Sequence, residues 1–178
     1  KKVKSIESGF TLIELMVVVF ITVLMSSLTL VNYRESKIRH SLSNSAQILI
    51  SDLRLAQNLA TSGVDLRGTY CGYGLNISSG SYSYFIYADI TNPCSASNHT
   101  YNDGDAIIQE VALFSGVRVG AAVPSPVDVF FEPPRPTTYI NNDDTKGFSA
   151  TIILEAERFP DIPVKTISVT TAGLIQSE

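Results

Sequence analysis

The 178-residue sequence contains no tryptophan, only two cysteines and only two histidines. His40 and His99 are too few and too far apart in the chain to indicate a zinc centre. The sequence also lacks a glycine-rich phosphate loop, a dinucleotide-binding fingerprint and a Gly-x-Ser-x-Gly nucleophile motif. No spacing pairs a nucleophile with a base. We therefore expect neither enzymatic activity nor a cofactor.

Glycine and proline are absent from residues 10–62, and charge is almost absent from the first part of that stretch. Between residues 10 and 31 the only charged side chain is Glu14. Twenty-two helical residues extend about 33 Å, close to the thickness of a bilayer's hydrocarbon core. A helix can cross lipid because it satisfies its own backbone hydrogen bonds. The pattern predicts a transmembrane helix over residues 10–31.

The helix is expected to continue beyond the apolar run, as an amphipathic segment over residues 32–62. Gly63 fits the position after a helix C-terminus, where a left-handed backbone needs no Cβ. Apolar residues in this segment recur in steps of four and three, which predicts one buried stripe that packs on a head of residues 63–178. The stripe consists of Ile38, Leu42, Ala46, Leu49, Leu53, Ala56 and Ala60.

After Gly63 the apolar period changes to two, which is typical of half-buried strands. We expect six to eight antiparallel strands separated by turns rich in glycine, proline, asparagine and aspartate. One long helix followed by these strands predicts the α+β class, with the helix packed on one face of an antiparallel β-sheet head. The expected strands cover residues 69–77, 81–88, 106–114, 117–119, 127–132, 149–155 and 164–170, with a short end at 174–176.

Positive charge is scarce in the head. From Gly63 to Glu178 there are six basic and thirteen acidic residues, a net charge of −7. Such a surface repels nucleic acid, so we do not expect nucleic acid as a partner. The positive-inside rule favours a cytoplasmic N-terminus, although basic residues occur on both sides of the apolar run. These residues are Lys1, Lys2 and Lys4 before it, and Arg34, Lys37 and Arg39 after it.

A specific motif joins the basic N-terminus to the apolar run. Residues 1–9 (KKVKSIESG) end in Gly9, and Phe10-Thr11-Leu12-Ile13-Glu14 follows directly. This order resembles the prepilin motif of type IV pilins and type II secretion pseudopilins, in which a membrane peptidase cuts after the glycine and methylates the new N-terminus. The resemblance implies a leader peptide over residues 1–9, cleavage between Gly9 and Phe10, N-methylation of Phe10 and an assembly role for Glu14. A secretory signal, a plain membrane anchor and a buried helix are the alternatives.

The remainder of the chain resembles the GspH/FimT-type minor pseudopilins. The resemblance implies a structural subunit of a type II secretion pseudopilus, with other pilins, the prepilin peptidase and the inner-membrane assembly platform as partners. It also implies a single pass through the bacterial inner membrane, with the N-terminus cytoplasmic and the head outside. A minor pilin of a type IV pilus, including a FimT-like pilin for DNA uptake, is the alternative; residues 174–178 lack the basic character of DNA-binding relatives. The matching segments are residues 51–58, 73–74, 112–119 and 169–174.

Two further features of the head leave alternatives open. A head outside the cytoplasm lies in a disulfide-permissive compartment, so Cys71 and Cys94 are predicted to form a bridge contributing about 3 kcal/mol, with unpaired thiols as the alternative. Asp103 and Asp105 in the Asn102–Asp105 loop are candidate calcium ligands, but the loop lacks the trailing glutamate of an EF-hand and equally suits a turn. Six aromatic residues suit either base stacking or strand packing: Tyr70, Tyr73, Tyr82, Tyr84, Phe85 and Tyr87.

Overall fold

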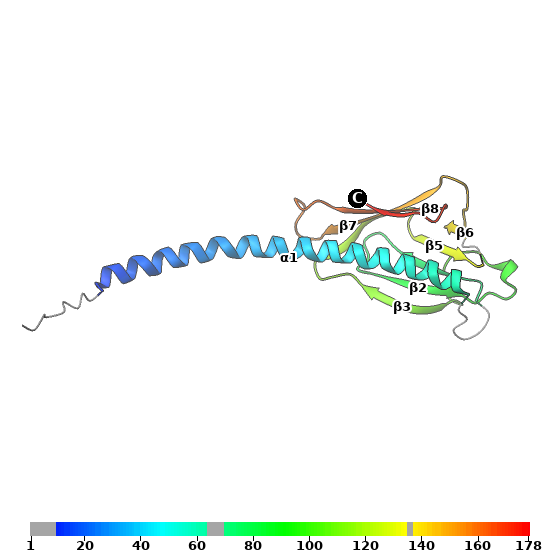
Figure 1. Ribbon diagram of the computed structural model, residues 1–178, viewed down its shortest axis with the longest axis horizontal. Helices are drawn as coiled ribbons and strands as arrows, with labels where there is room; N and C mark the ends of the chain where they lie inside the picture. The colour runs from blue at the N-terminus through cyan, green and yellow to red at the C-terminus, as the bar shows by residue number, and fades with distance from the viewer. Residues whose placement is uncertain (1–9, 64–69, 135–136) are drawn as a thin grey trace, which may run out of the picture. The chain divides into compact units, whose positions relative to one another are not determined.

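The computed structural model describes residues 10–63, 70–134 and 137–178, without the side chains of residues 28–32. The predicted leader, residues 1–9, lies outside the described residues. The chain divides into two compact units, Lys1–Lys37 and Ile38–Glu178. Helix α1, Leu12–Ser62, contributes to both units, and the second unit holds all the strands of the described residues (Figure 1).

The second part of α1 buries the predicted stripe. Gly63, directly after the helix, has a φ of +59°, the left-handed conformation expected there. Ile38 is only partly buried, at the edge of the core. The other six stripe residues, each at most 4 % exposed, are Leu42, Ala46, Leu49, Leu53, Ala56 and Ala60.

The strands of the described residues form two antiparallel sheets. The five-stranded sheet has the order β3-β2-β1-β5-β6, and the four-stranded sheet has the order β4-β7-β8-β9. The first sheet contains β1 Gly72–Ile77, β2 Ser83–Asp89, β3 Ala106–Ala112, β5 Val127–Glu132 and β6 Thr137–Ile140. The second contains β4 Val117–Val123, β7 Ser149–Ala156, β8 Lys165–Thr170 and β9 Ile175–Ser177, and a short 3-10 helix, η1, covers Cys94–Ala96.

The stripe of α1 and the inner faces of both sheets share a single hydrophobic core. Polar contacts also join the helix to the sheet region, among them the bond from the Phe114 N–H, after β3, to the Ser45 hydroxyl at 3.2 Å. The Tyr84 hydroxyl on β2 donates to Asp52 at 2.6 Å, and the Gln57 amide donates to the Gly173 carbonyl, between β8 and β9, at 3.3 Å. The predicted α+β architecture is confirmed. Its strands, however, divide into two sheets, where we expected the helix to cover one face of a single sheet.

Strand positions agree with the period-two pattern except at two places. β6 was not predicted, because it has only four residues and follows a run of prolines. β4 extends to Val123, four residues beyond its predicted end, because β7 pairs with it through a register shift near Gly120. Residue 69, the predicted first residue of the β1 strand, lies outside the described residues.

Candidate functional site

Thr11 caps the N-terminus of helix α1, which begins at Leu12. Its hydroxyl oxygen accepts a weak hydrogen bond from the Glu14 N–H at 3.4 Å, and its carbonyl accepts one from the Leu15 N–H at 3.2 Å. Thr11 and Glu14 therefore occupy the first and last positions of a Thr-x-x-Glu capping box. Glu14 also lies in the first helical turn, where the helix dipole favours a negative charge.

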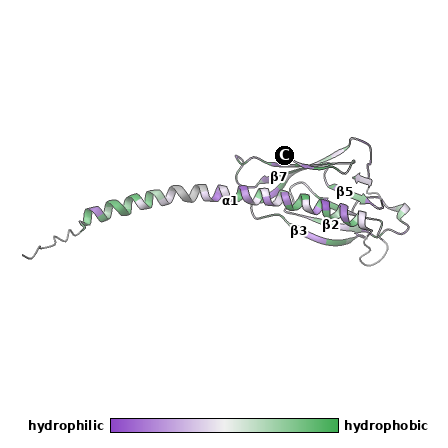
Figure 2. Cartoon of the chain, viewed as in Figure 1, coloured by the Kyte–Doolittle hydropathy of each residue, from purple (hydrophilic) through white to green (hydrophobic). Residues whose placement is uncertain are grey.

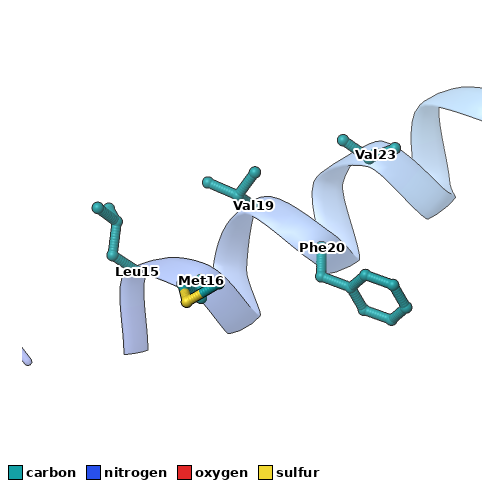
Figure 3. Close-up of a pocket in the computed structure, with 5 residues that line it drawn as sticks. All are labelled: Leu15, Met16, Val19, Phe20 and Val23. Carbon is teal, nitrogen blue, oxygen red and sulfur yellow. The ribbon is translucent and has the colours of Figure 1, made fainter. Parts of the chain in front are cut away.

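The first turns of α1 expose large apolar side chains around the helix. Figure 2 shows this segment coloured as hydrophobic. Phe10 is 78 % exposed and Leu12 77 % exposed. Figure 3 shows five apolar side chains of the same segment standing on the helix surface: Leu15, Met16, Val19, Phe20 and Val23. A helix that is apolar all round needs either lipid or neighbouring apolar helices to cover it.

Hydroxyl groups within this apolar segment bond to the helix itself. Thr22 donates to the Val19 carbonyl at 2.9 Å, and Ser26 donates to the Thr22 carbonyl at 2.7 Å. Ser27 does the same with the Leu24 carbonyl at 2.8 Å. These side chains therefore add little polarity to the surface of the segment.

Among the residues that the structure describes, no helix combines the length and the apolar character needed to cross a membrane. Residues 28–31 of the predicted span have side chains outside the described set.

In the head, a disulfide joins Cys71, just before β1, to Cys94 in η1, with a Cα–Cα distance of 5.1 Å. The bridge ties the start of the first strand to the segment between β2 and β3. Asp89, at the end of β2, holds the same segment through two contacts. Its carboxylate accepts the Thr91 N–H at 2.8 Å and the Ser97 hydroxyl.

Three carboxylates lie near the Tyr87 hydroxyl on the outer face of the five-stranded sheet: Asp89, Asp105 and Asp128. Asp89 and Asp128 are buried. Asp128 accepts the Asn76 amide at 2.9 Å and the Tyr101 N–H at 3.2 Å, yet burial raises its pKa above the usual range. Burial and the neighbouring Asp89 charge also raise the pKa of Asp105, against the lowering effect of the Asn102 N–H. Burial, with the charge of Asp128, raises the pKa of Tyr87.

The predicted calcium candidates belong to a hydrogen-bonded turn. The Asn102 N–H donates to the Asp105 carboxylate at 2.9 Å, and the Gly104 N–H donates to the Asn102 side-chain oxygen at 3.0 Å. Asp103 is exposed. In the described ranges no group of three or more His, Cys, Asp or Glu side chains is placed to hold a metal ion. The two hydrogen bonds of the Asn102–Asp105 loop are those of a turn.

The aromatic residues pack within the head rather than form an open platform. Tyr73, Tyr84 and Tyr87 are almost fully buried, and Tyr82 is exposed but donates to Glu157 at 2.8 Å. On the outer face of the five-stranded sheet, the His99 ring stacks on Tyr139 with centroids 3.8 Å apart. These contacts favour the strand-packing alternative over base stacking.

Sequence reasoning missed two features of these sites. The capping role of Thr11 had a readable signal, since a Thr three residues before a Glu at the start of an apolar run is typical of a helix N-terminus. The gathering of Asp89, Asp105 and Asp128 had none, because the three residues come from different segments and meet only through strand pairing.

Comparison with known proteins gives one match. Residues 4–30 match the prokaryotic N-terminal methylation motif. No curated protein and no solved structure matches the chain. The matched residues include Gly9, Phe10 and Glu14 and extend into helix α1, whose later part packs on antiparallel sheets, an architecture consistent with the pilin fold. The chain thus carries the N-terminal methylation motif of the type IV pilin and pseudopilin superfamily.

Proposed function

We propose that this chain is a structural minor pseudopilin of a type II secretion pseudopilus, inserted into the filament through helix α1. The methylation motif at residues 4–30 is the observation that supports a pilin-type subunit. The segments that resemble GspH/FimT-type proteins, one at the end of α1 and three in the head, support a minor subunit of this kind, and minor pilins of type IV pili share them. The acidic head, with its net charge of −7, argues against a role in DNA uptake.

The proposed assembly mechanism uses the two ends of the motif. Removal of residues 1–9 gives Phe10 a free, methylated amine, which remains cationic. Glu14 lies four residues further on, and it is the only charged residue between residues 10 and 31. An unpaired carboxylate in lipid is expensive, so contact with a neighbouring subunit's amine stabilises the packed helices. Only one axial stagger brings the two charges together, which also fixes the register.

A Glu14→Ala variant tests this mechanism. We expect normal membrane insertion and normal cleavage, because the substitution makes the segment more apolar. Crosslinking to partner pilins and recovery in sheared filaments should fall strongly. Thr22→Val is the matched control, since it removes a hydroxyl that bonds only to the Val19 carbonyl among described contacts. Incorporation of the Glu14→Ala protein at the wild-type level beside its natural partners would rule out the charge-pairing mechanism.

The choice of filament needs a separate measurement. Deleting the gene should abolish secretion of folded enzymes and leave twitching motility unchanged if the subunit belongs to a pseudopilus. Loss of motility or surface piliation, with secretion intact, would instead assign the chain to a type IV pilus.

A further inference from the structure

The two sheets of the head have four edges, formed by β3, β4, β6 and β9. A sheet edge presents unpaired backbone N–H and C=O groups, so proteins usually shorten, cover or charge it. β9 has three residues and β6 four. The edge of β4 is covered by the turn before β2, because Gly80 N–H donates to the Val119 carbonyl at 2.7 Å and Val119 N–H donates to the Ser81 carbonyl at 2.9 Å.

The edge of β3 is longer and open. Its register aligns Val111 with Tyr84, and the next residue after the strand, Leu113, donates its N–H to the Tyr82 carbonyl at 2.8 Å. Because residues of an antiparallel pair alternate between facing the partner and facing away, Glu110 and Ala112 direct their N–H and C=O groups away from β2. Within the described parts of the chain, no backbone hydrogen bond reaches these four groups.

The side chains of β3 do little to protect this edge. The strand, AIIQEVA, contains neither lysine nor proline, the residues that most often block edge pairing. Ile107 is 53 % exposed and Ile108 38 % exposed. The register shift opposite Ile86 and Tyr87 leaves the ladder regular from Gln109 to Ala112.

An apolar hollow lies beside the regular part of the edge. It is lined by Ser45 and Ile48 of α1, by Tyr84, and by Val111–Phe114 at the end of β3. Ile48 and Phe114 both remain partly exposed on this surface.

We propose that β3 is a docking edge for an extended segment of another protein, which adds a sixth strand to the five-stranded sheet and places a cationic side chain opposite Glu110. The outward backbone groups select an extended chain, because only a strand can pair with them in sequence. Glu110, which accepts the Ser83 hydroxyl at 3.3 Å, supplies a negative charge on the edge itself. The net charge of −7 over residues 63–178 also favours a cationic over an anionic segment at long range.

A second copy of this chain fits the edge less well. It would bring an equally negative head and its own Glu110 to the contact, and like charges across strands are destabilising. The proposal does not depend on which filament, if any, the chain joins.

Synthetic peptides test the edge without knowledge of the natural partner. The probe is a fluorescent ten-residue peptide that alternates valine with lysine, added to the full chain in detergent micelles and followed by anisotropy. The first control replaces lysine by glutamate and should bind about fivefold more weakly. The second control methylates the backbone nitrogens on both edges of the peptide and should lose binding, because neither edge can then donate ladder hydrogen bonds to β3.

Two protein variants locate the site. Glu110→Pro removes an N–H that faces away from β2, so it should abolish binding while leaving the sheet intact, as far-UV circular dichroism would verify. Glu110→Lys should reverse the preference between the lysine and glutamate peptides. Val123→Lys, at an exposed position on the edge strand of the other sheet, is the matched control and should leave binding unchanged.

Each result decides the proposal in one direction. Binding that survives backbone methylation, or an unaltered peptide preference in Glu110→Lys, would exclude strand pairing at β3. Absence of binding by either peptide at millimolar concentration would overturn it as well. Concentration-dependent dimerisation lost in Glu110→Pro would make a second copy the occupant. Should Glu110→Pro fail to fold, the methylated peptide and Glu110→Lys still decide the question.

Discussion

At the residue scale, Gly74 shows how the outer face of the five-stranded sheet is built. Gly74 of β1 stands opposite Tyr87 of β2, and a Cβ added to it would lie 2.5 Å from the Tyr87 ring. A Cβ added to Gly72 would lie 2.3 Å from the Phe130 ring. The two glycines therefore leave room for aromatic rings to lie over β1, where any side chain would displace them.

Substitution of Gly74 should reveal this constraint. Gly74→Ala is expected to destabilise the head by about 1–3 kcal/mol through overpacking, although alanine normally favours ordered backbone. Gly104→Ala is the control, because its Cβ would meet only the Asn102 side-chain oxygen, at 3.1 Å. Urea unfolding of both variants measures the difference. Equal stability of Gly74→Ala and wild type would show that the Tyr87 ring moves aside freely.

Asp105 should give the head a measurable pH dependence. Its raised pKa means that the folded head binds this proton more tightly than the unfolded chain, whose value is near 3.8. The contribution of Asp105 to stability therefore falls as pH rises from 3.8 through the folded pKa. Asp105→Asn should raise the melting temperature at pH 7 relative to wild type, and the gain should shrink below pH 3.8.

Thermal melts from pH 3 to pH 7 provide the measurement. The exposed neighbour Asp103, changed to Asn, is the control and should follow the wild-type profile. A difference between Asp105→Asn and wild type that stays constant across this range would contradict the assignment. It would mean that the substitution acts through the hydrogen bond from Asn102 rather than through charge.

At the element scale, α1 packs on the head through one face only, and two nearby leucines lie on opposite sides of this division. Leu53 is fully buried, while Leu55, two residues on, is 41 % exposed. Leu53→Ala should cost about 2–5 kcal/mol because it opens a cavity in the core, whereas Leu55→Ala should have a much smaller effect. Chemical denaturation of the two variants tests the docking of the helix. An unchanged melting temperature for Leu53→Ala would place the stripe outside the core.

The sequence predicts an element well when the burial of its residues follows the period of a helix or a strand. The stripe of α1 and the strand β7 were predictable because their burial follows the period of one element. β6 was not, because Thr137–Ile140 is too short to show a period and owes its pairing to β5. The partition into two sheets depends on contacts between segments far apart in the chain, for which local periodicity contains no information.

Among the candidate site residues, those within one contiguous segment could be recognised from the sequence, and those placed by distant segments could not. The motif that contains Gly9, Phe10 and Glu14 could be recognised because it is contiguous, and the Thr11 cap was readable from the same few residues. The roles of Gly9, Phe10 and Glu14 in cleavage, methylation and assembly stay predictions. The buried position of Asp128 was not, because it rests on the Asn76 amide and the Tyr101 N–H. Its own strand, VDVFFE, gives that position the appearance of an outward-facing polar residue.

At the scale of the whole molecule, the strongest expectation concerns its mature form. In cells that contain the prepilin peptidase, we predict cleavage between Gly9 and Phe10 and one added methyl group on the Phe10 amine. Intact-mass and N-terminal peptide mass spectrometry of membrane extracts would detect both changes. Cells that lack the peptidase are the control and should hold only the longer form. Finding only the uncut chain in peptidase-positive cells would remove the basis for the assembly mechanism.

The position of the Thr11 cap has a consequence for maturation. Thr11 and Glu14, which organise the first helical turn, both lie on the mature side of the predicted scissile bond. Cleavage at Gly9–Phe10 would therefore leave both residues of the Thr11 cap in the mature chain. What it changes is the chemistry of the terminus: a peptide bond becomes an amine, two residues before the first residue of helix α1.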